Sequence, residues 1–276
     1  MGIVNVTPDS FSDGGEYLDP AAAISHGREL VAEGAGILDI GGESTRPGAA
    51  AVPAAEELRR VIPVIEGLGD AAARISVDTS KADVAEAAIA AGAGIVNDVT
   101  ALSDPRMAAV CAEAGVEVIL MHMLGTPRTM QDDPRYEDVV IDVRDFLATR
   151  VALAVDAGID ERQIWIDPGI GFGKTVAHNL ELIRRLGELR ELGRPLVLGS
   201  SRKRFIGALS GREVDERLGG TIAANAIGYL NGADVLRVHD VKATCDALAV
   251  VAAIIGEREW RLAAEAVDGV EAGGVE

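Results

Sequence analysis

Polar residues of several chemical types stand at the ends of short apolar runs in this 276-residue chain. They are Asn5, Asp39, Asp78, Asn97, Asp98, His122, Asp167, Arg237 and His239. An Asp or Asn in such a place commonly caps a helix or starts a turn. Capping does not require carboxylates, amides, imidazoles and a guanidinium together. The mixture instead indicates a ligand that carries both hydrogen-bond donors and anionic groups.

Two loops are suited to an anionic ligand. Segment 41–48 places hydroxyls and a guanidinium on a glycine-rich bend, which suits a phosphate group. Segment 200–204 packs three cationic residues into a chain of net charge −18. A solvated charge run is the ordinary interpretation of such a cluster, but the loops after the last two strands of a barrel often hold phosphate. Lys203, Arg237 and His239 are therefore predicted to form a cationic corner.

Three catalytic motifs are excluded by their spacing. Segment 168–175 ends in the Gly-Lys-Thr of a P-loop, but the first glycine of that pattern falls at Pro168, so an NTPase is excluded. The spacing of Gly169, Gly171 and Gly173 does not match a dinucleotide-binding fingerprint. No Ser-His-Asp set accompanies a strained serine elbow.

Eight apolar or β-branched runs alternate with amphipathic, alanine-rich stretches, the pattern of βαβ units and a parallel sheet. The predicted strands are Gly2–Val6, Ile37–Gly41, Arg74–Asp78, Gly94–Asp98, Glu117–His122, Gln163–Asp167, Pro195–Gly199 and Asp234–His239. This count favours a single-domain α/β protein, a (β/α)8 TIM barrel, over a doubly wound sheet, which usually has fewer strands. The barrel is predicted over residues 1–256, and a closing helix with a frayed acidic tail over 257–276. Because all barrel strands open on one face at their carboxyl ends, the polar residues are expected to converge there.

The composition excludes several classes of partner. The 44 acidic and 26 basic residues give a surface that repels nucleic acid and anionic lipid, so neither nucleic acid nor a membrane is expected as a partner. The longest apolar run, 247–256, is too short to cross a bilayer, and no signal segment opens the chain. Cys111 and Cys245 form no metal or disulfide motif. We therefore expect a cytoplasmic protein.

The chain resembles one enzyme family through nearly its whole length. The segments that carry the resemblance, in order, are Met1–Gly15, Asp39–Gly48, Ser76–Ser80, Asn97–Val99, Met121–Gln131, Asp167–Lys174, Ser200–Gly207 and Arg237–Val241. They are similar to those of dihydropteroate synthase, a transferase family of folate biosynthesis. The resemblance implies a (β/α)8 barrel, usually a homodimer, that joins 6-hydroxymethyl-7,8-dihydropterin diphosphate to 4-aminobenzoate. The implied products are 7,8-dihydropteroate and pyrophosphate, with Mg²⁺ as cofactor.

The resemblance also implies which residues bind each part of the substrates. The residues expected around the pterin ring are Asp78, Asn97, Asp167 and Lys203, with Met121 and Phe172 on its apolar face. Those expected around the diphosphate are Asn5, Thr45, Arg46, Arg237 and His239, with Asn5 also reaching Mg²⁺. Those expected around 4-aminobenzoate are Phe11, Thr45, Arg46, Pro47 and Lys203. The pterin assignment has a physical basis, because a carboxylate accepts two adjacent N–H donors in bidentate fashion.

Catalysis is expected to depend on stabilising the departing pyrophosphate rather than on a strong base. The residues to which the resemblance gives this role are Asn5, Arg46, Lys203, Arg237 and His239. Segment 5–15 ends in paired glycines and is predicted to be a mobile lid that shields the reacting carbon from water.

The chain departs from the family pattern in two places. Arg204 stands where many relatives have serine, beside the expected aminobenzoate pocket, and sulfonamide sensitivity is expected despite it. The chain also begins almost at its first predicted strand, whereas many members have a preceding segment. We therefore expect either that the amino-terminal end of the barrel is less well sealed or that the true start of the chain lies earlier.

Two alternatives share the predicted pterin pocket. One is a methyltransferase that passes a methyl group from a methyl-tetrahydropteridine to a corrinoid protein, as related barrels do. The other is a non-catalytic paralogue that binds a pterin for regulation or supports a partner. The diphosphate set at Thr45-Arg46 and Arg237-Val238-His239 favours the synthase. No substitution of the matched residues supports a loss of activity, which argues against the non-catalytic paralogue.

Overall fold

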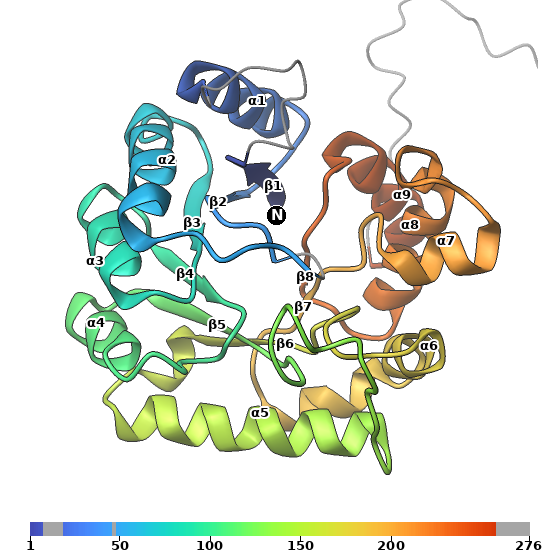
Figure 1. Cartoon of the computed structure of the whole chain (residues 1–276). Helices are drawn as coiled ribbons and strands as arrows, with labels where there is room; N and C mark the ends of the chain where they lie inside the picture. The colour runs from blue at the N-terminus through green and yellow to red at the C-terminus, as the bar shows by residue number, and fades with distance from the viewer. Residues whose placement is uncertain (8–18, 46–47, 258–276) are drawn as a thin grey trace, which may run out of the picture.

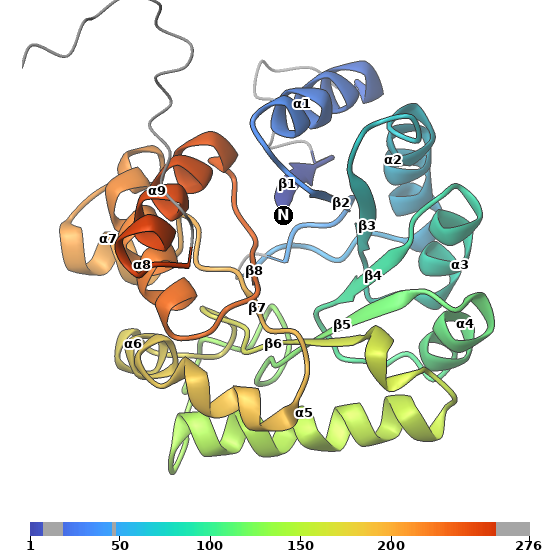
Figure 2. The ribbon, with the colours of Figure 1, turned by 180° about the vertical axis from the view of Figure 1, so that it is seen from behind.

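The computed structural model describes residues 1–7, 19–45 and 48–257. Parallel strands alternate with helices that surround them on the outside (Figure 1, Figure 2). The strands are β1 Gly2–Asn5, β2 Ile37–Gly41, β3 Arg74–Asp78, β4 Ile95–Asp98, β5 Glu117–Met121, β6 Ile164–Asp167, β7 Val197–Leu198 and β8 Val235–Leu236. The α-helices are α1 Pro20–Ala32, α2 Ala54–Gly67, α3 Ala82–Ala90, α4 Met107–Ala114, α5 Val139–Asp156, α6 Val176–Arg184, α7 Arg204–Ser210, α8 Leu218–Leu230 and α9 Val241–Ile254. Short 3-10 helices are η1 Glu161–Gln163, η2 Leu186–Leu192 and η3 Val214–Glu216.

The strands close into the predicted (β/α)8 barrel. Strands β1 to β6 pair in sequence order, and β7 pairs with β8. Isolated parallel bridges between Ile166 and Leu196 and between Gly2 and Val238 join the two sheets. The fold class and the places of all the predicted strands are therefore confirmed.

The last two strands are shorter than predicted, and at the start of β7 a proline and a side chain take the place of ladder hydrogen bonds. Pro195 has no N–H to donate. The carboxylate of Asp234 accepts the backbone N–H of Leu196 at 2.8 Å, in place of a strand partner. The regular pairing is thus confined to Val197–Leu198 and Val235–Leu236.

The barrel interior is layered, because successive side chains of a strand point to opposite faces. Buried Ile95, Ile119, Trp165 and Val197 pack together as one apolar cluster. Residues two places further along these strands face the same way, which puts the next interior layer at the carboxyl ends. This upper layer is polar and is the region in which the predicted site residues lie.

Helix termini follow local rules where the sequence predicted them. Asp19 caps α1 by accepting the N–H of Ala21 at 2.9 Å, and Pro20 occupies the first helical position, where no N–H is needed. Within the described ranges, none of the helices has the length and apolar character that crossing a membrane requires. The closing helix and tail predicted over 257–276 lie outside the described residues except for Glu257.

Candidate active site

A buried polar network occupies the carboxyl end of the barrel. Asp39 accepts three hydrogen bonds, from Ser76 Oγ at 2.6 Å, Asn97 Nδ2 at 3.1 Å and Arg237 Nε at 2.6 Å. A second nitrogen of the Arg237 guanidinium donates to Asp78 Oδ2 at 2.8 Å. Strand register explains the meeting, because Asp39 pairs with Ser76 and Asp78 with Asn97. Three of the predicted site residues, Asp78, Asn97 and Arg237, are thereby brought together.

The electrostatics of the network follow from its burial. Burial raises the pKa of Asp78 to about 7, although Arg237 opposes this shift. Burial works against the Arg237 cation, but Asp39 and Asp78 outweigh it and raise the pKa of the guanidinium. Arg237 is thus a permanent cation held between two carboxylates, with 19% of its side chain exposed.

Asp167 lies at the end of β6 with one carboxylate oxygen already engaged. Oδ1 accepts the backbone N–H of Gly169 at 2.7 Å, and the residue is 5% exposed. Gly199 directly follows β7, and a Cβ at this position would lie 3.9 Å from Asp167 Oδ2 and 3.9 Å from Arg237 Cβ. The glycine therefore leaves room beside both side chains. Burial raises the pKa of Asp167, while the Gly169 N–H and Lys203 act to lower it.

Lys203 and an apolar cluster form the wall of the same region. Lys203 stands at the N-cap of α7, and its Nζ lies 4.2 Å from the centroid of the Phe172 ring. Burial first, and Arg237 second, lower the pKa of Lys203 to about 8. Phe172 and Met121 pack with Val99 and Met130 in one buried cluster. The predicted cation and both predicted apolar residues are thus neighbours.

The predicted cationic corner is smaller than expected. In segment 200–204, Arg202 pairs with Asp240, with its Nε donating to Oδ2 at 3.0 Å, and Arg204 is exposed. His239 Nδ1 lies 2.9 Å from Ser201 Oγ. Burial, then Arg237 and Arg202, lower the pKa of His239 to about 3, so the ring is neutral near pH 7.

Asp98 and His122, two of the polar residues predicted to converge at the strand ends, have structural roles instead. Asp98 accepts the backbone N–H groups of Thr100 and Leu102, each at 2.8 Å, and so caps the turn after β4. His122 Nδ1 lies 2.8 Å from Lys174 Nζ, and burial lowers the pKa of both residues. The buried Lys174 belongs to this pair, which agrees with rejecting a P-loop.

The glycine-rich segment after β6 needs its glycines for close packing. Gly169 has φ of +66°, and a Cβ there would stand 1.9 Å from the carbonyl oxygen of His122. Lys174 Nζ donates to the Phe172 carbonyl at 3.0 Å, which ties the end of the segment to Phe172. The segment therefore presents Phe172 to the site as part of a rigid turn.

A set of ion pairs fixes the base of the loop after β2. Lys81 Nζ contacts Glu43 Oε2 and lies 2.5 Å from Glu57 Oε2. Glu43 Oε1 also accepts the N–H of Val52 at 2.9 Å, so one carboxylate holds both ends of the loop. Figure 1 shows the loop extending from β2 toward β7 and β8 before it returns to α2. Gly48 N donates to the carbonyl of Pro127 at 3.2 Å, which joins it to the loop after β5.

The remaining predicted residues are placed only in part. Asn5, at the end of β1, pairs in register with Gly41 and is partly exposed. Thr45 is also partly exposed. Phe11, Arg46 and Pro47, and most of the predicted lid 5–15, lie outside the described residues.

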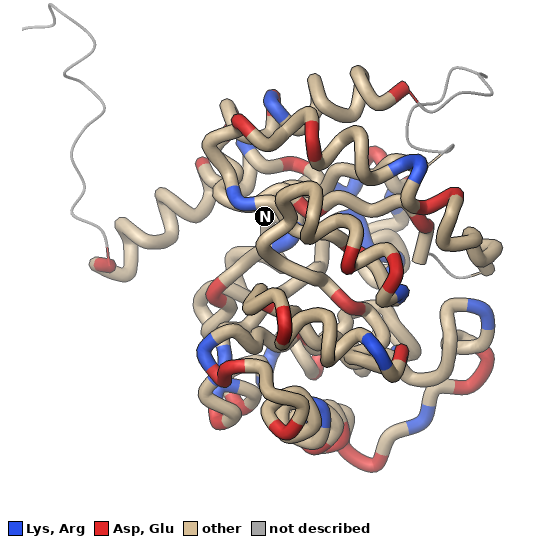
Figure 3. The backbone as a smooth tube through the Cα atoms, turned by 90° about the vertical axis from the view of Figure 1, so that its left-hand side faces the viewer, with Lys and Arg blue, Asp and Glu red and all other residues tan. Residues whose placement is uncertain are grey.

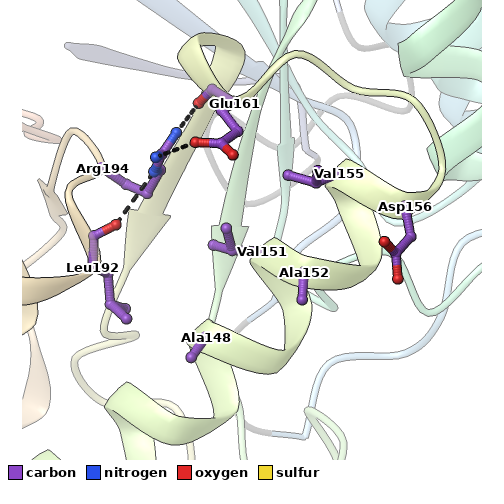
Figure 4. A pocket seen from close by; sticks show the side chains of 8 residues that line it. All are labelled: Ala148, Val151, Ala152, Val155, Asp156, Glu161, Leu192 and Arg194. Atoms are coloured by element: carbon purple, nitrogen blue, oxygen red, sulfur yellow. Dashed lines mark hydrogen bonds and ion pairs between the residues drawn. The ribbon is translucent and has the colours of Figure 1, made fainter.

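A separate shallow groove of about 360 Å³ lies against α5, away from the carboxyl ends of the strands (Figure 4). It is lined by Ala148, Val151, Ala152, Val155, Asp156, Glu161, Leu192 and Arg194. The Arg194 guanidinium donates to Glu161 Oε2 at 2.8 Å at one side of it. None of the predicted site residues lines this groove, so it is not the candidate site.

Sequence reasoning missed two members of the polar network. The sequence places Asp39 at a strand end and Ser76 in a segment of the family resemblance, but it assigns neither residue a role in the site. Both lie two residues before a position of the upper layer, Gly41 and Asp78 respectively, on the same strand face. The alternation of side chains along a strand, with a period of two residues, is the sequence signal that places Asp39 and Ser76 on the interior face.

Residues 1–239 match the family described as pterin binding enzyme, which is the class that this barrel and its network of buried acceptors define. The dihydropteroate synthase of Escherichia coli strain K12 is 46% identical over 260 residues, covering 94% of this chain and 92% of that protein. That of Mycobacterium leprae is 49% identical over 261 residues, covering 92% of each. The solved Xanthomonas albilineans dihydropteroate synthase with 4-aminobenzoic acid is 55% identical with a TM-score of 0.87, covering 92% of both chains.

The chain therefore belongs to the dihydropteroate synthase family, and it is a transferase of folate biosynthesis. The family and the reaction class predicted from the sequence are confirmed. A structure of the Xanthomonas albilineans enzyme in complex with 7,8-dihydropteroate is 51% identical to this chain, with a TM-score of 0.84.

Proposed function

We propose that this enzyme joins the methylene carbon of 6-hydroxymethyl-7,8-dihydropterin diphosphate to the amine of 4-aminobenzoate. The C–N bond forms as the C–O bond to the diphosphate breaks, pyrophosphate leaves, and the amine loses one proton. The observation that carries the proposal is the close approach of a buried hydrogen-bond acceptor and a cation at the carboxyl end of the barrel. Asp167 Oδ2 and Arg237 both border the space left by Gly199.

The pterin ring is assigned to the deeper part of the site. Asp167 uses Oδ1 for the Gly169 N–H, so its other oxygen and remaining lone pairs accept the adjacent amino and ring N–H donors. Asn97 offers a donor and an acceptor, and Lys203 donates to the acceptor edge of the ring. The apolar face packs on Met121 and Phe172, which are both at least nine-tenths buried. Asp78, which pairs in register with Asn97, is a further acceptor.

The diphosphate is assigned to the rim of the barrel. Arg237 supplies fixed positive charge, while His239, being neutral, acts as a hydrogen-bond partner rather than as a cation. Its Nδ1 is engaged by Ser201, which leaves Nε2 for a phosphate oxygen. Thr45 and Arg46 of the second loop, together with Asn5, complete the proposed set. These groups stabilise the charge that develops on pyrophosphate as it departs.

Mg²⁺ is proposed as the cofactor on the chemistry of the donors. Among the described residues, no three acidic, histidine or cysteine side chains cluster as a metal site. A single amide oxygen from Asn5 with substrate phosphates suits Mg²⁺, which prefers oxygen ligands and retains several waters. When bound, the ion would neutralise charge on the leaving group.

The aminobenzoate pocket is assigned to Phe11, Thr45, Arg46, Pro47 and Lys203, between the first two loops and the pterin. The lid in segment 5–15 and the second loop would exclude water from the electrophilic methylene. A sulfonamide resembles 4-aminobenzoate, so we propose that the enzyme is a sulfonamide target, as the Yersinia pestis enzyme solved with a sulfonamide drug suggests. Product formation that stays unchanged under a large excess of sulfonamide would remove this part.

A homodimer is proposed from an apolar face on α8 and α9. Ile227, Leu230, Val250 and Ile254 are 47%, 49%, 60% and 78% exposed. The last turns of α9 extend from the body of the molecule, and residues 247–256 carry no charge (Figure 3). A second copy of the chain would cover this face. Light scattering tests it: Ile227→Glu with Val250→Glu should give monomers, whereas Ile141→Glu on α5 should not.

A cytoplasmic location is proposed as well. Cys111 and Cys245 are both free thiols, the state that a reducing compartment maintains.

The reaction is tested by measuring pyrophosphate release from the dihydropterin diphosphate in the presence of Mg²⁺, with and without 4-aminobenzoate. We expect release that depends on 4-aminobenzoate and a product with the mass of dihydropteroate. Pterin binding without this product would contradict the proposal and favour the methyltransferase, which a methyl-tetrahydropteridine and a corrinoid acceptor would then test.

A further inference from the structure

One oxygen of Asp39 receives hydrogen bonds from two different parts of the site. Oδ2 accepts both Asn97 Nδ2 at 3.1 Å and Arg237 Nε at 2.6 Å. The other oxygen accepts Ser76 Oγ at 2.6 Å. Asn97 belongs to the proposed pterin subsite and Arg237 to the proposed diphosphate subsite. A shift of this carboxylate therefore moves a contact in each subsite.

Asp39 itself is out of reach of a ligand. Its exposed fraction is 0%, and so is that of Ser76, its register partner on β3. Asp78 lies two residues beyond Ser76 on the same face of β3 and pairs in register with Asn97, so these two residues form the next layer toward the carboxyl ends of the strands. Asp39 therefore acts on a substrate only through the side chains it holds.

The carboxylate also fixes the direction of the Arg237 guanidinium. Nε is held by Asp39 and a terminal nitrogen by Asp78 at 2.8 Å, so the planar group has two anchors on different strands. With one anchor lost, the guanidinium could pivot about the other. When Asp39 stays hydrogen-bonded to Asn97, its carboxylate keeps the Arg237 guanidinium from pivoting, even before a phosphate binds.

We propose that Asp39 is a positioning residue that couples the pterin subsite to the diphosphate subsite. This inference rests on the proposed function, because it takes Asn97 and Arg237 as the contacts of the two substrate parts. A pterin that orders Asn97 orders Asp39, and Asp39 orders Arg237. The two ligand parts then bind with positive cooperativity, and by linkage each raises the affinity of the other by the same factor.

The test uses 6-hydroxymethylpterin and inorganic pyrophosphate as separate molecules, in the presence of Mg²⁺. Isothermal titration gives the Kd of pyrophosphate with and without saturating pterin, and the ratio of the two values measures the coupling. For the unaltered enzyme we expect a ratio of about five or more. For Asp39→Ala we expect the ratio to fall close to one, with both ligands still measurable.

Asp39→Asn and Ser76→Ala separate positioning from a general loss of packing. An asparagine can keep its oxygen toward Asn97 and Arg237, because the Ser76 hydroxyl can rotate and accept from the amide. We therefore expect Asp39→Asn to restore the ratio. Ser76→Ala removes a bond from the same carboxylate without touching either ligand contact, and should retain the ratio. If Asp39→Ala does not fold, Asn97→Ala is measured instead at saturating pterin. This variant removes the hydrogen bond between the pterin subsite and Asp39, so it should also abolish the coupling.

The outcomes distinguish this inference from the proposed function. An unaltered enzyme that binds both ligands without coupling, or an Asp39→Ala enzyme with an undiminished ratio, would overturn the inference alone. Failure of the unaltered enzyme to bind either ligand would overturn the proposed function and the inference that rests on it.

Discussion

Asp167→Asn should weaken pterin binding strongly, and the structure decides how the new amide is oriented. The carboxylate oxygen Oδ1 accepts the Gly169 N–H at 2.7 Å, so an asparagine must keep its oxygen on that side. Its NH2 group then takes the place of Oδ2 and faces the pterin donors. Losing the charge-assisted bond costs about 2 kcal/mol and the unsatisfied donor about 1 kcal/mol. The expected increase in the Kd of dihydropterin is about 150-fold.

Titration calorimetry with 6-hydroxymethyl-7,8-dihydropterin measures this change, with thermal unfolding as a check on the fold. Asp98→Asn is a matched control, because Asp98 is also a buried carboxylate at a strand end but only caps the turn to Thr100 and Leu102. The control should lower Tm and leave the Kd of the pterin unchanged. An Asp167→Asn protein that binds pterin with unaltered affinity would refute the proposed orientation of the ring.

Three further changes probe other parts of the site. Arg237→Ala should spare the free pterin and raise the Kd of its diphosphate at least about tenfold, as a lost charge-assisted bond does; equal losses for both ligands in calorimetry would show that the subsites are not separate. Because the pKa of Lys203 is lowered to about 8, its ammonium is lost as pH rises through that value. The KM for the pterin substrate should therefore rise above about pH 8 in the native enzyme and not in Lys203→Met. A matching rise in the variant would assign the titration to another group. Lys81→Met leaves the carboxylates of Glu43 and Glu57 without their cation and should lower the free energy of unfolding by about 2 kcal/mol, less than for a fully buried pair because Lys81 is 25% exposed. In urea denaturation, adding Glu57→Gln should restore part of this free energy. No recovery would mean that the lost cation is not the cause.

The sequence was sufficient to predict the fold because the relevant signals are local. Each strand is a short apolar run, and a barrel sends every strand end to one face. Asp78, Asn97, Asp167 and Arg237 could therefore be expected to share a site before their distances were known.

The role of Asp39 depends on partners far away along the chain and could not be predicted in the same way. Its contact with Arg237 spans 198 residues and exists only because the barrel closes. The Arg202 side chain also depends on a partner far along the chain. Its backbone has a φ of +56°, and its guanidinium forms an ion pair with Asp240 instead of joining the site. The neutral state of His239 likewise depends on burial and nearby cations.

The most direct test of the account is a crystal structure of the enzyme with 6-hydroxymethyl-7,8-dihydropterin diphosphate and Mg²⁺. We expect the amino and ring N–H groups on Asp167, the phosphates at Arg237 and His239, and the metal at Asn5. A ring bound with its donors away from Asp167, or phosphates held at Lys203 with Arg237 unoccupied, would contradict it.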